Sequence, residues 1–167
     1  MPAKDALVLD ASVALSWCFE DEESTYPYTV LDRLETGQAL VPGIWALEVG
    51  NALIVAERRG RLTKADSTRF VALLGQLPII INQDFPERMF GEIIALAREH
   101  NLSTYDASYL DLAMRSGLPL ATQEPRLLHA ARQCGVEIYP EQGGSSFSRQ
   151  RLNCGAACLY GNAYARR

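Results

Sequence analysis

Histidine and cysteine are scarce in this chain of 167 residues, which contains two histidines and four cysteines. His100 and His129 fall in the last turn or on the polar side of predicted helices, so catalysis by histidine has little support. Cys154 and Cys158 are four residues apart with no histidine near them, which is poor spacing for a zinc site. The cysteines do not suggest a disulfide framework either. The sequence therefore favours chemistry that depends on neither residue type.

Long hydrophobic runs are absent as well. No stretch approaches the ~20 apolar residues that a membrane-spanning helix needs. Residues 1–5 lead directly into a predicted strand with no separate apolar signal segment, so we expect a cytoplasmic location. The length suits one domain with a sizeable core, and 48% hydrophobic with 22% charged residues is typical of a soluble globular protein.

An overall excess of basic residues is also missing, since the formal net charge is −4. The four arginines and the single glutamate of residues 141–167 give that segment a charge of +3, which leaves −7 on residues 1–140. A domain this acidic is not typical of a non-specific nucleic-acid binder, which is normally basic. If the protein acts on nucleic acid, it needs metal ions or a local basic patch to offset the repulsion.

Short apolar runs alternate with longer helical segments along the first 140 residues. Parallel sheets are built in this way, because each connection between their strands is a helical crossover. We therefore predict an α/β fold with a central, mostly parallel, five-stranded sheet. The predicted strands are Ala6–Leu9, Ala39–Val41, Pro78–Asn82, Leu118–Ala121 and Val136–Tyr139.

The first predicted strand ends in a carboxylate. Asp10 follows Leu9 directly and has apolar residues on both sides, so solubility does not explain it. Open α/β sheets bind their ligands beyond the carboxyl ends of the strands, which is where Asp10 would lie. The alternative is that Asp10 or Ser12 only caps the helix that begins at Ala11.

Glu48 is the second candidate site residue. The predicted helix from Ile44 to Ala56 is apolar nearly all round, and Glu48 and Asn51 share one face of it because they are three residues apart. A buried carboxylate without a partner is costly, so Glu48 needs a partner or a cavity, and a cation is the partner that fits best. We expect Asn51 to reach towards the same cavity. The alternative places Glu48 at an exposed edge of the helix.

Two further acids lie close to the fourth predicted strand. Asp106 is three residues after Ser103, so a capping box explains both, yet a helix N-terminus beside the sheet is also a useful place for a fixed carboxylate. Glu124 lies two residues after Thr122, beyond the fourth strand. Ser12 and Thr122 each follow a strand near an acid, and we expect them to orient carboxylates. The alternative is that these hydroxyls merely cap helices.

Acids gathered at one edge of a sheet repel one another, by roughly 4 kcal/mol per pair at ~4 Å and intermediate dielectric. Such a cluster persists if some members hold protons or if a divalent cation lies among them. Oxygen ligands without cysteine or histidine favour Mg²⁺ or Mn²⁺ over zinc, and such ions can activate water beside a phosphodiester. We expect one ion to touch at least two of Asp10, Glu48 and Asp106, with Glu124 also in the catalytic set.

At these residues the chain resembles the PIN-domain family, specifically the VapC-type toxins of bacterial toxin–antitoxin pairs. The resembling blocks occur in order along most of residues 6–140: Val8–Ser12, Pro42–Glu48 with Asn51, Leu102–Leu110 and Leu118–Thr122. The resemblance implies a three-layer α/β/α sandwich, Mg²⁺- or Mn²⁺-dependent cleavage of RNA, and a small antitoxin that blocks the site. It matches Asp10, Glu48 and Asp106 to metal-site acids, with Asp10 and Asp106 as our predicted metal ligands. We also expect a homodimer.

The chain departs from the family pattern in two places. Glu124, beside Pro125, stands where the family usually has an aspartate, which affects the geometry of a second ion. Residues 141–167 lie outside the resemblance, and their Gly, Ser and Arg content predicts an irregular or disordered extension. The predicted nuclease domain is therefore residues 1–140.

Two other functions stay open at this level. Phosphoryl transfer through an aspartyl intermediate also places an aspartate after the first strand, but Asp10 is followed by Ala11 and Ser12 without the second acid of an Asp-x-Asp motif. The other is a catalytically impaired PIN-like module that binds RNA or protein, favoured if Glu124 or the C-terminal extension has disabled the site.

Overall fold

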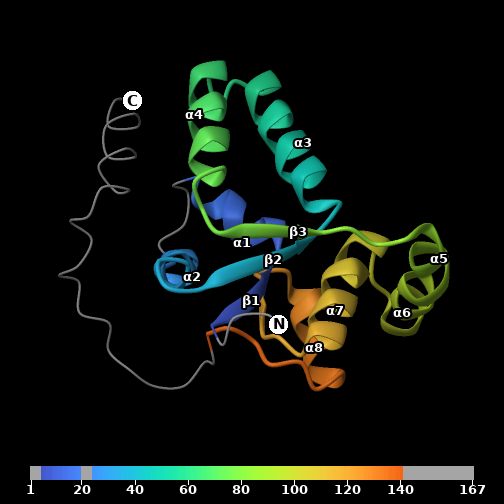
Figure 1. The fold of residues 1–167 in the computed structure, drawn as a ribbon. Helices are drawn as coiled ribbons and strands as arrows, with labels where there is room; N and C mark the ends of the chain where they lie inside the picture. The colour runs from blue at the N-terminus through green and yellow to red at the C-terminus, as the bar shows by residue number, and fades with distance from the viewer. Residues whose placement is uncertain (1–4, 20–23, 141–167) are drawn as a thin grey trace.

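The computed structural model describes residues 5–19 and 24–140. The fold is a three-layer α/β/α sandwich around a parallel four-stranded sheet in the order β3-β2-β1-β4 (Figure 1). Val8 of the central strand pairs with Leu40 on one side and with Leu120 on the other. The strands are β1 Ala6–Leu9, β2 Gln38–Pro42, β3 Ile79–Asn82 and β4 Leu120–Ala121.

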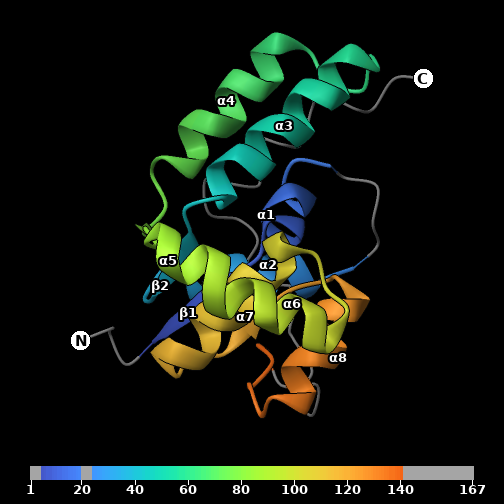
Figure 2. The same ribbon diagram turned by 90° about the vertical axis from the view of Figure 1, so that its right-hand side faces the viewer.

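Helices cover both faces of the sheet. Figure 1 shows α3 and α4 on one side of the sheet and α7 and α8 on the other, and Figure 2 shows α5 and α6 beside α7. None of the helices in the described residues is both long and apolar enough to cross a membrane. The helices are α1 Ala11–Ser16, α2 Tyr26–Arg33, α3 Trp45–Arg58, α4 Lys64–Leu74, α5 Pro86–Arg88, α6 Ile94–His100, α7 Thr104–Ser116 and α8 Pro125–Gln133, with a π-helical turn at Met89–Ile93.

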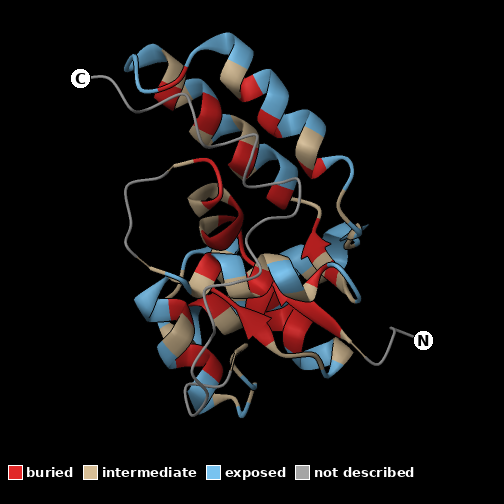
Figure 3. Cartoon of the chain, turned by 90° about the vertical axis from the view of Figure 1, so that its left-hand side faces the viewer, coloured by how far each residue is buried: buried red, intermediate tan, exposed pale blue. Residues whose placement is uncertain are grey.

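The core is centred on β1, whose four residues are all buried. A strand covered by helices on both faces is apolar along its whole length rather than alternating, which explains the sequence Ala-Leu-Val-Leu. Figure 3 shows that buried residues concentrate in the sheet and on the helix faces turned towards it. Leu7 and Leu9 are fully buried, and burying such a side chain stabilises a fold by about 1.5–3 kcal/mol. The core thus holds β1, and the residue that follows it, in a fixed position.

Local signals set the ends of two helices. Thr63 and Asp66 form a complete capping box at the start of α4. Ser103 is the N-cap of α7 and accepts a hydrogen bond from the amide of Asp106 at 3.0 Å. Gly117 ends α7 with φ at +64°, a conformation that residues with side chains rarely adopt.

The fifth predicted strand is reduced to a single parallel bridge between Ile138 and Leu120. The amide of Leu120 donates to the carbonyl of Glu137 at 2.8 Å, and the amide of Tyr139 donates to the carbonyl of Leu120 at 2.9 Å. Since β4 is only two residues long, it offers little ladder for a fifth strand. The π-helical turn at Met89–Ile93 lies between α5 and α6. The predicted extension, residues 141–167, lies outside the described residues.

Candidate functional site

Asp10 lies directly after β1, and the ladder between β1 and β4 continues to it because its amide donates to the carbonyl of Ala121 at 3.0 Å. It occupies the N-cap position of α1, but its side chain accepts no capping hydrogen bond from that helix, so helix capping does not explain this carboxylate. The residue is only 5% exposed, and its Oδ2 accepts hydrogen bonds from the hydroxyls of Ser12 and Thr122, each at 2.6 Å. The carboxylate is therefore held by two side chains and buried at the carboxyl edge of the sheet.

The two hydroxyls that hold Asp10 are themselves fixed by the backbone. Ser12 Oγ accepts from the amide of Gln123 at 3.1 Å, and Thr122 Oγ1 accepts from the amide of Glu124 at 3.0 Å. Because each hydroxyl oxygen already accepts a backbone hydrogen bond, its own proton is directed to Asp10. Ser12 and Thr122 thus join the segment after β1 to the segment after β4.

Glu48 lies in the first turn of α3 and is half-buried rather than at an exposed edge. Its Oε2 accepts a short hydrogen bond from the hydroxyl of Tyr109 on α7. Burial, this hydrogen bond and the charge of Asp10 all raise the pKa of Tyr109, so the phenol keeps its proton and donates it. Sequence reasoning missed Tyr109. Its position three residues after Asp106, on the same face of α7, was the available signal.

Asp106 lies in the first turn of α7 and is partly exposed. Its Oδ2 accepts a hydrogen bond from the hydroxyl of Ser103 at 2.8 Å, while Ser103 Oγ accepts from the Asp106 amide. Ser103 therefore caps α7, but the reciprocal bond of a capping box, from the Ser103 backbone amide to the Asp106 side chain, is not formed. Asp106 also acts beyond the start of α7, because its charge raises the pKa values of Asp10 and Glu48.

Asp10, Glu48 and Asp106 form one negatively charged neighbourhood, which we call the acidic cluster. Burial raises the pKa of Asp10, hydrogen bonds from Ser12 and Thr122 oppose that rise, and the charge of Asp106 adds to it. Burial also raises the pKa of Glu48, opposed by the hydrogen bond from Tyr109 and reinforced by the charges of Asp10 and Asp106. Within the described part of the chain, the charges that act on these two carboxyls are those of other acids.

The donor chemistry of the acidic cluster fits a hard divalent cation. Its members offer only carboxylate oxygens, and a cation would offset the charge that raises their pKa values. Each carboxylate is engaged by a protein hydroxyl, from Ser12 and Thr122, from Tyr109 or from Ser103. Across residues 5–19 and 24–140, no three Asp, Glu, His or Cys side chains lie close enough together to hold one ion. Convergence on a single ion therefore requires side-chain rotation and stays a prediction.

Two predicted site residues lie apart from the acidic cluster. Glu124 is exposed at the N-cap of α8, and its charge is not among those that act on Asp10 or Glu48. Asn51 is exposed on α3, and its side chain forms no hydrogen bond with another described residue. The catalytic role of Glu124 and the orienting role of Asn51 stay predictions.

Tyr26 is a further residue near the site that sequence reasoning missed. Its hydroxyl accepts from the amide of Thr122 at 3.1 Å and donates to the carbonyl of Tyr139 at 2.7 Å. Burial raises the pKa of Tyr26 to about 12, and the charge of Asp10 contributes to that rise. Because Tyr26 and Thr122 are 96 residues apart, no local pattern could reveal the contact.

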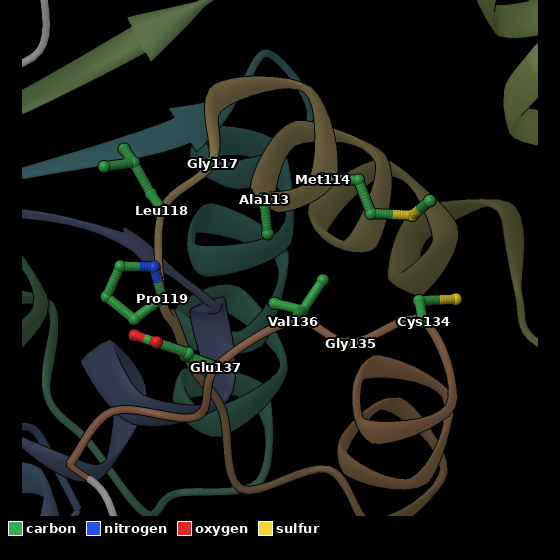
Figure 4. A pocket seen from close by; sticks show the side chains of 9 residues that line it. All are labelled: Ala113, Met114, Gly117, Leu118, Pro119, Cys134, Gly135, Val136 and Glu137. Atoms are coloured by element: carbon green, nitrogen blue, oxygen red, sulfur yellow. The ribbon is translucent and has the colours of Figure 1, made fainter.

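A separate cavity of about 370 Å³ lies at the opposite, amino end of β4 (Figure 4). None of the predicted site residues lines it. The lining residues are Ala113, Met114, Gly117, Leu118, Pro119, Cys134, Gly135, Val136 and Glu137. The acidic cluster, which lies after the carboxyl ends of β1 and β4, is therefore the stronger candidate for chemistry.

Comparison with known proteins identifies similar sequences. A family model described as PIN domain matches residues 7–133. A curated protein, Exonuclease VapC9 from Pyrobaculum aerophilum, is 38% identical over 82 residues, which cover 48% of this chain and 58% of that protein. The aligned part thus spans less than two thirds of the length of this relative.

Solved structures show the same fold. The crystal structure of PAE2754 from Pyrobaculum aerophilum superimposes with a TM-score of 0.58 at 28% identity, covering 75% of this chain and 86% of that chain. FitAcB from Neisseria gonorrhoeae gives a TM-score of 0.54 at 18% identity, covering 79% of this chain and 95% of that chain. At that identity the second likeness shows the fold alone.

Proposed function

Because the chain belongs to the PIN-domain family, we propose that it is a metal-dependent endoribonuclease that acts as the toxin of a toxin–antitoxin pair. The acidic cluster carries this proposal. Asp10, Glu48 and Asp106 come from three separate segments of the chain, yet the ionisation of each of the first two depends on the charge of Asp106. The similarity to a relative named as an exonuclease supports nuclease chemistry.

In this proposal Asp10 and Asp106 hold Mg²⁺ or Mn²⁺, and Glu48 is the third carboxylate of the centre. When bound, such a cation would activate water and stabilise the charge that develops on a phosphodiester. Asp10 suits the first ligand position because it is buried, central and fixed. Asp106 suits the second because it is more exposed and needs only to leave the hydroxyl of Ser103.

The other residues of the site position these acids. Ser12 and Thr122 hold Asp10 and favour its ionised form, which is the form that binds a cation. Tyr109 holds Glu48 at Oε2. Glu48 is half-buried beside the other two acids, and we assign it the role of general base that accepts the proton of the attacking water.

The proposed substrate is RNA in the cytoplasm, and the proposed partner is a small antitoxin that blocks the acidic cluster. The VapC-type sequence blocks and the relative Exonuclease VapC9 support this assignment. The name of that relative specifies cleavage from an end, whereas we propose internal cleavage. The two modes differ in their products. A single internal cut leaves the two end labels of an RNA on two separate fragments, whereas cleavage from an end does not.

We further propose that the active form is a homodimer. Phe85 and Phe90 are 77% and 78% exposed, and Ile80 and Ile81 are exposed on the edge strand β3. Exposed apolar residues on an edge strand and in the segment that follows it are typical of an interface. Light scattering of the purified chain should report a dimer, and a Phe85→Ser, Phe90→Ser double variant should report a monomer. A wild-type monomer, or a variant that stays dimeric, would contradict this interface.

The test of the proposed function uses the full chain, free of antitoxin, and a synthetic RNA labelled at both ends. With Mn²⁺ we expect labelled fragments produced by internal cuts, and with chelator we expect none. Asp106→Asn should cleave at least ~10-fold more slowly, which is the low end for the loss of a group near a metal. Cleavage that persists in chelator, or at the wild-type rate in Asp106→Asn, would contradict the proposal.

A catalytically impaired binding module is the second candidate, and the position of Glu124 favours it. The family aspartate is replaced here by a longer acid whose side chain is exposed and apart from the cluster. In that case the protein would bind RNA with Mn²⁺ present and leave it intact. A gel-shift assay beside the cleavage assay separates the two functions.

A further inference from the structure

Tyr26, at the start of α2, connects two segments that lie far along the chain. Its hydroxyl accepts from the amide of Thr122 at 3.1 Å and donates to the carbonyl of Tyr139 at 2.7 Å. The carbonyl of Thr122 is farther from this hydroxyl, at 3.3 Å, so the single phenolic proton is directed to Tyr139. The oxygen of Tyr26 is thereby left to accept from Thr122.

The backbone beside Tyr26 is fixed without the help of Thr122. The indole of Trp17 donates to the carbonyl of Pro27, the residue after Tyr26, at 2.8 Å, and both of these residues are buried. Trp17 is the C-cap of α1, the helix that begins directly after Asp10. The start of α2 is therefore anchored to the helix that follows the buried acid.

The acceptor on the other side of Tyr26 is also held in place. At the end of α2, the guanidinium of Arg33 lies 5.9 Å from the centre of the Tyr139 ring. The same guanidinium pairs with Asp5, directly before β1, at 2.5 Å. Because α2 contacts Tyr139 from both of its ends, the carbonyl that orients the Tyr26 hydroxyl has a fixed position.

The amide of Thr122 depends on this tyrosine. Thr122 is 2% exposed, so its amide needs an acceptor inside the protein, and the Tyr26 hydroxyl is that acceptor. The side chain of Thr122 donates to Oδ2 of Asp10 at 2.6 Å, and the direction of this bond follows from the backbone of Thr122. A buried amide without an acceptor is costly, so loss of the Tyr26 hydroxyl would drive this backbone to move towards another partner.

We propose that Tyr26 is a positioning residue of the acidic cluster: by holding the amide of Thr122, it keeps the Thr122 hydroxyl on Asp10. The proposal gives α2 a role in the site, although α2 contributes no carboxylate to the cluster. Its effect on metal binding rests on the proposed function, whereas the positioning of Thr122 does not.

The first experiment measures the Mn²⁺ dissociation constants of full-length Tyr26→Phe, Thr122→Val and the double variant by calorimetry. We expect Tyr26→Phe to weaken binding by about threefold or more, short of the ~10-fold expected for Thr122→Val, because it acts through that residue. In the Thr122→Val background, Tyr26→Phe should change the affinity by less than about 1.5-fold, since coupled residues are not additive. Tyr28→Phe, which removes an exposed hydroxyl from the same helix, should bind as wild type does.

A second control separates positioning from stability. Val30 is fully buried on α2, so Val30→Ala should lower the melting temperature and leave the Mn²⁺ affinity of the folded protein unchanged. Wild-type affinity in Tyr26→Phe would overturn the inference. So would equal losses of affinity in Tyr26→Phe and Val30→Ala, or a full effect of Tyr26→Phe in the Thr122→Val background.

The second experiment needs no metal and therefore separates this inference from the proposed function. Hydrogen exchange of single amides, followed by NMR, compares Thr122 with Val8, whose amide donates to the carbonyl of Pro119 at 2.8 Å. The exchange rate of Thr122 relative to Val8 should rise at least ~10-fold in Tyr26→Phe and stay at the wild-type value in Val30→Ala, because only the first change opens the site locally. An unchanged ratio in Tyr26→Phe would overturn the inference, whether or not Mn²⁺ binds. Absence of Mn²⁺ binding by wild type with a raised ratio would contradict the proposed function alone.

Discussion

Thr122 donates its hydroxyl to Oδ2 of Asp10 across 2.6 Å, although the two residues are 112 positions apart in the sequence. The parallel pairing of β1 with β4 creates this contact, because it brings the carboxyl ends of the two strands to the same edge. Thr122 is 2% exposed and its hydroxyl is fixed by the amide of Glu124. The site is therefore built on the sheet itself rather than on a mobile loop.

Thr122→Val should weaken Mn²⁺ binding by about 10-fold, the low end for a lost partner of a metal ligand. The change removes one of the two hydroxyls that favour the ionised form of Asp10. Thr122→Ser keeps the hydroxyl and should stay within about twofold of wild type by calorimetry. Wild-type affinity in Thr122→Val would show that this hydrogen bond does not position a metal ligand.

Asp106→Asn should lose cleavage activity while its melting temperature, measured without metal, holds or rises. Ser103 stays the N-cap of α7, asparagine keeps a side-chain oxygen for the hydroxyl of Ser103, and one repelling charge leaves the acidic cluster. Glu124→Gln is the matched control, because it removes one negative charge from an exposed side chain apart from the cluster. We expect a smaller loss of cleavage in that control. Equal losses in both variants would argue against a special role for Asp106.

Tyr109→Phe should shift the acidic limb of the pH–rate profile to higher pH. The Tyr109 hydroxyl donates to Glu48 and lowers the pKa of that carboxyl, so removing it leaves burial and the neighbouring acids to raise the pKa further. Glu48 then stays protonated, and unable to act as a base, up to a higher pH. Single-turnover cleavage rates across pH give the measurement. An unchanged limb would exclude Glu48 as the titrating group.

The stability of the metal-free protein should fall as pH rises above the ordinary pKa values of Asp10 and Glu48. Both pKa values are raised by folding, so between the unfolded and the folded pKa the native state binds more protons, and the free energy of unfolding decreases with pH. Asp10→Asn removes one of these groups, so its melting temperature should fall less steeply with pH and exceed that of wild type near neutrality.

Thermal scans of both proteins without metal test this prediction. Asp66, whose pKa is lowered by its bonds with Thr63, contributes the opposite trend. It is present in both proteins, so the difference between them isolates Asp10. A melting temperature of Asp10→Asn that lies below wild type at neutral pH would contradict the account of Asp10 as an acid whose charged form is disfavoured by burial.

The sequence predicted the placement of Asp10 because β1 is a fully buried strand, and a carboxylate directly after such a strand must lie at the edge of the sheet. Ser12 and Thr122 could be named for the same reason. The fold class followed from the alternation of strands and helices. The strand at Val136–Tyr139 was overestimated, because an apolar run does not reveal that its partner β4 is two residues long.

The aromatic contacts of the site could not be predicted in this way. Tyr109 and Glu48 are 61 residues apart, and their hydrogen bond depends on how α7 and α3 pack on either side of the sheet edge. Tyr26 joins Thr122 and Tyr139 through a packing arrangement that no local pattern encodes. The same limit applies to Glu124, whose position after β4 suggested a cluster member although its side chain is exposed.

The central claim is that the acidic cluster is a metal site. A calorimetric titration of the full chain with Mn²⁺ tests this claim most directly. We expect saturable binding by wild type, affinity reduced at least ~10-fold in Asp10→Asn and in Asp106→Asn, and little change in Glu124→Gln. Equal binding by wild type and Asp10→Asn, or no saturable binding by wild type, would contradict it.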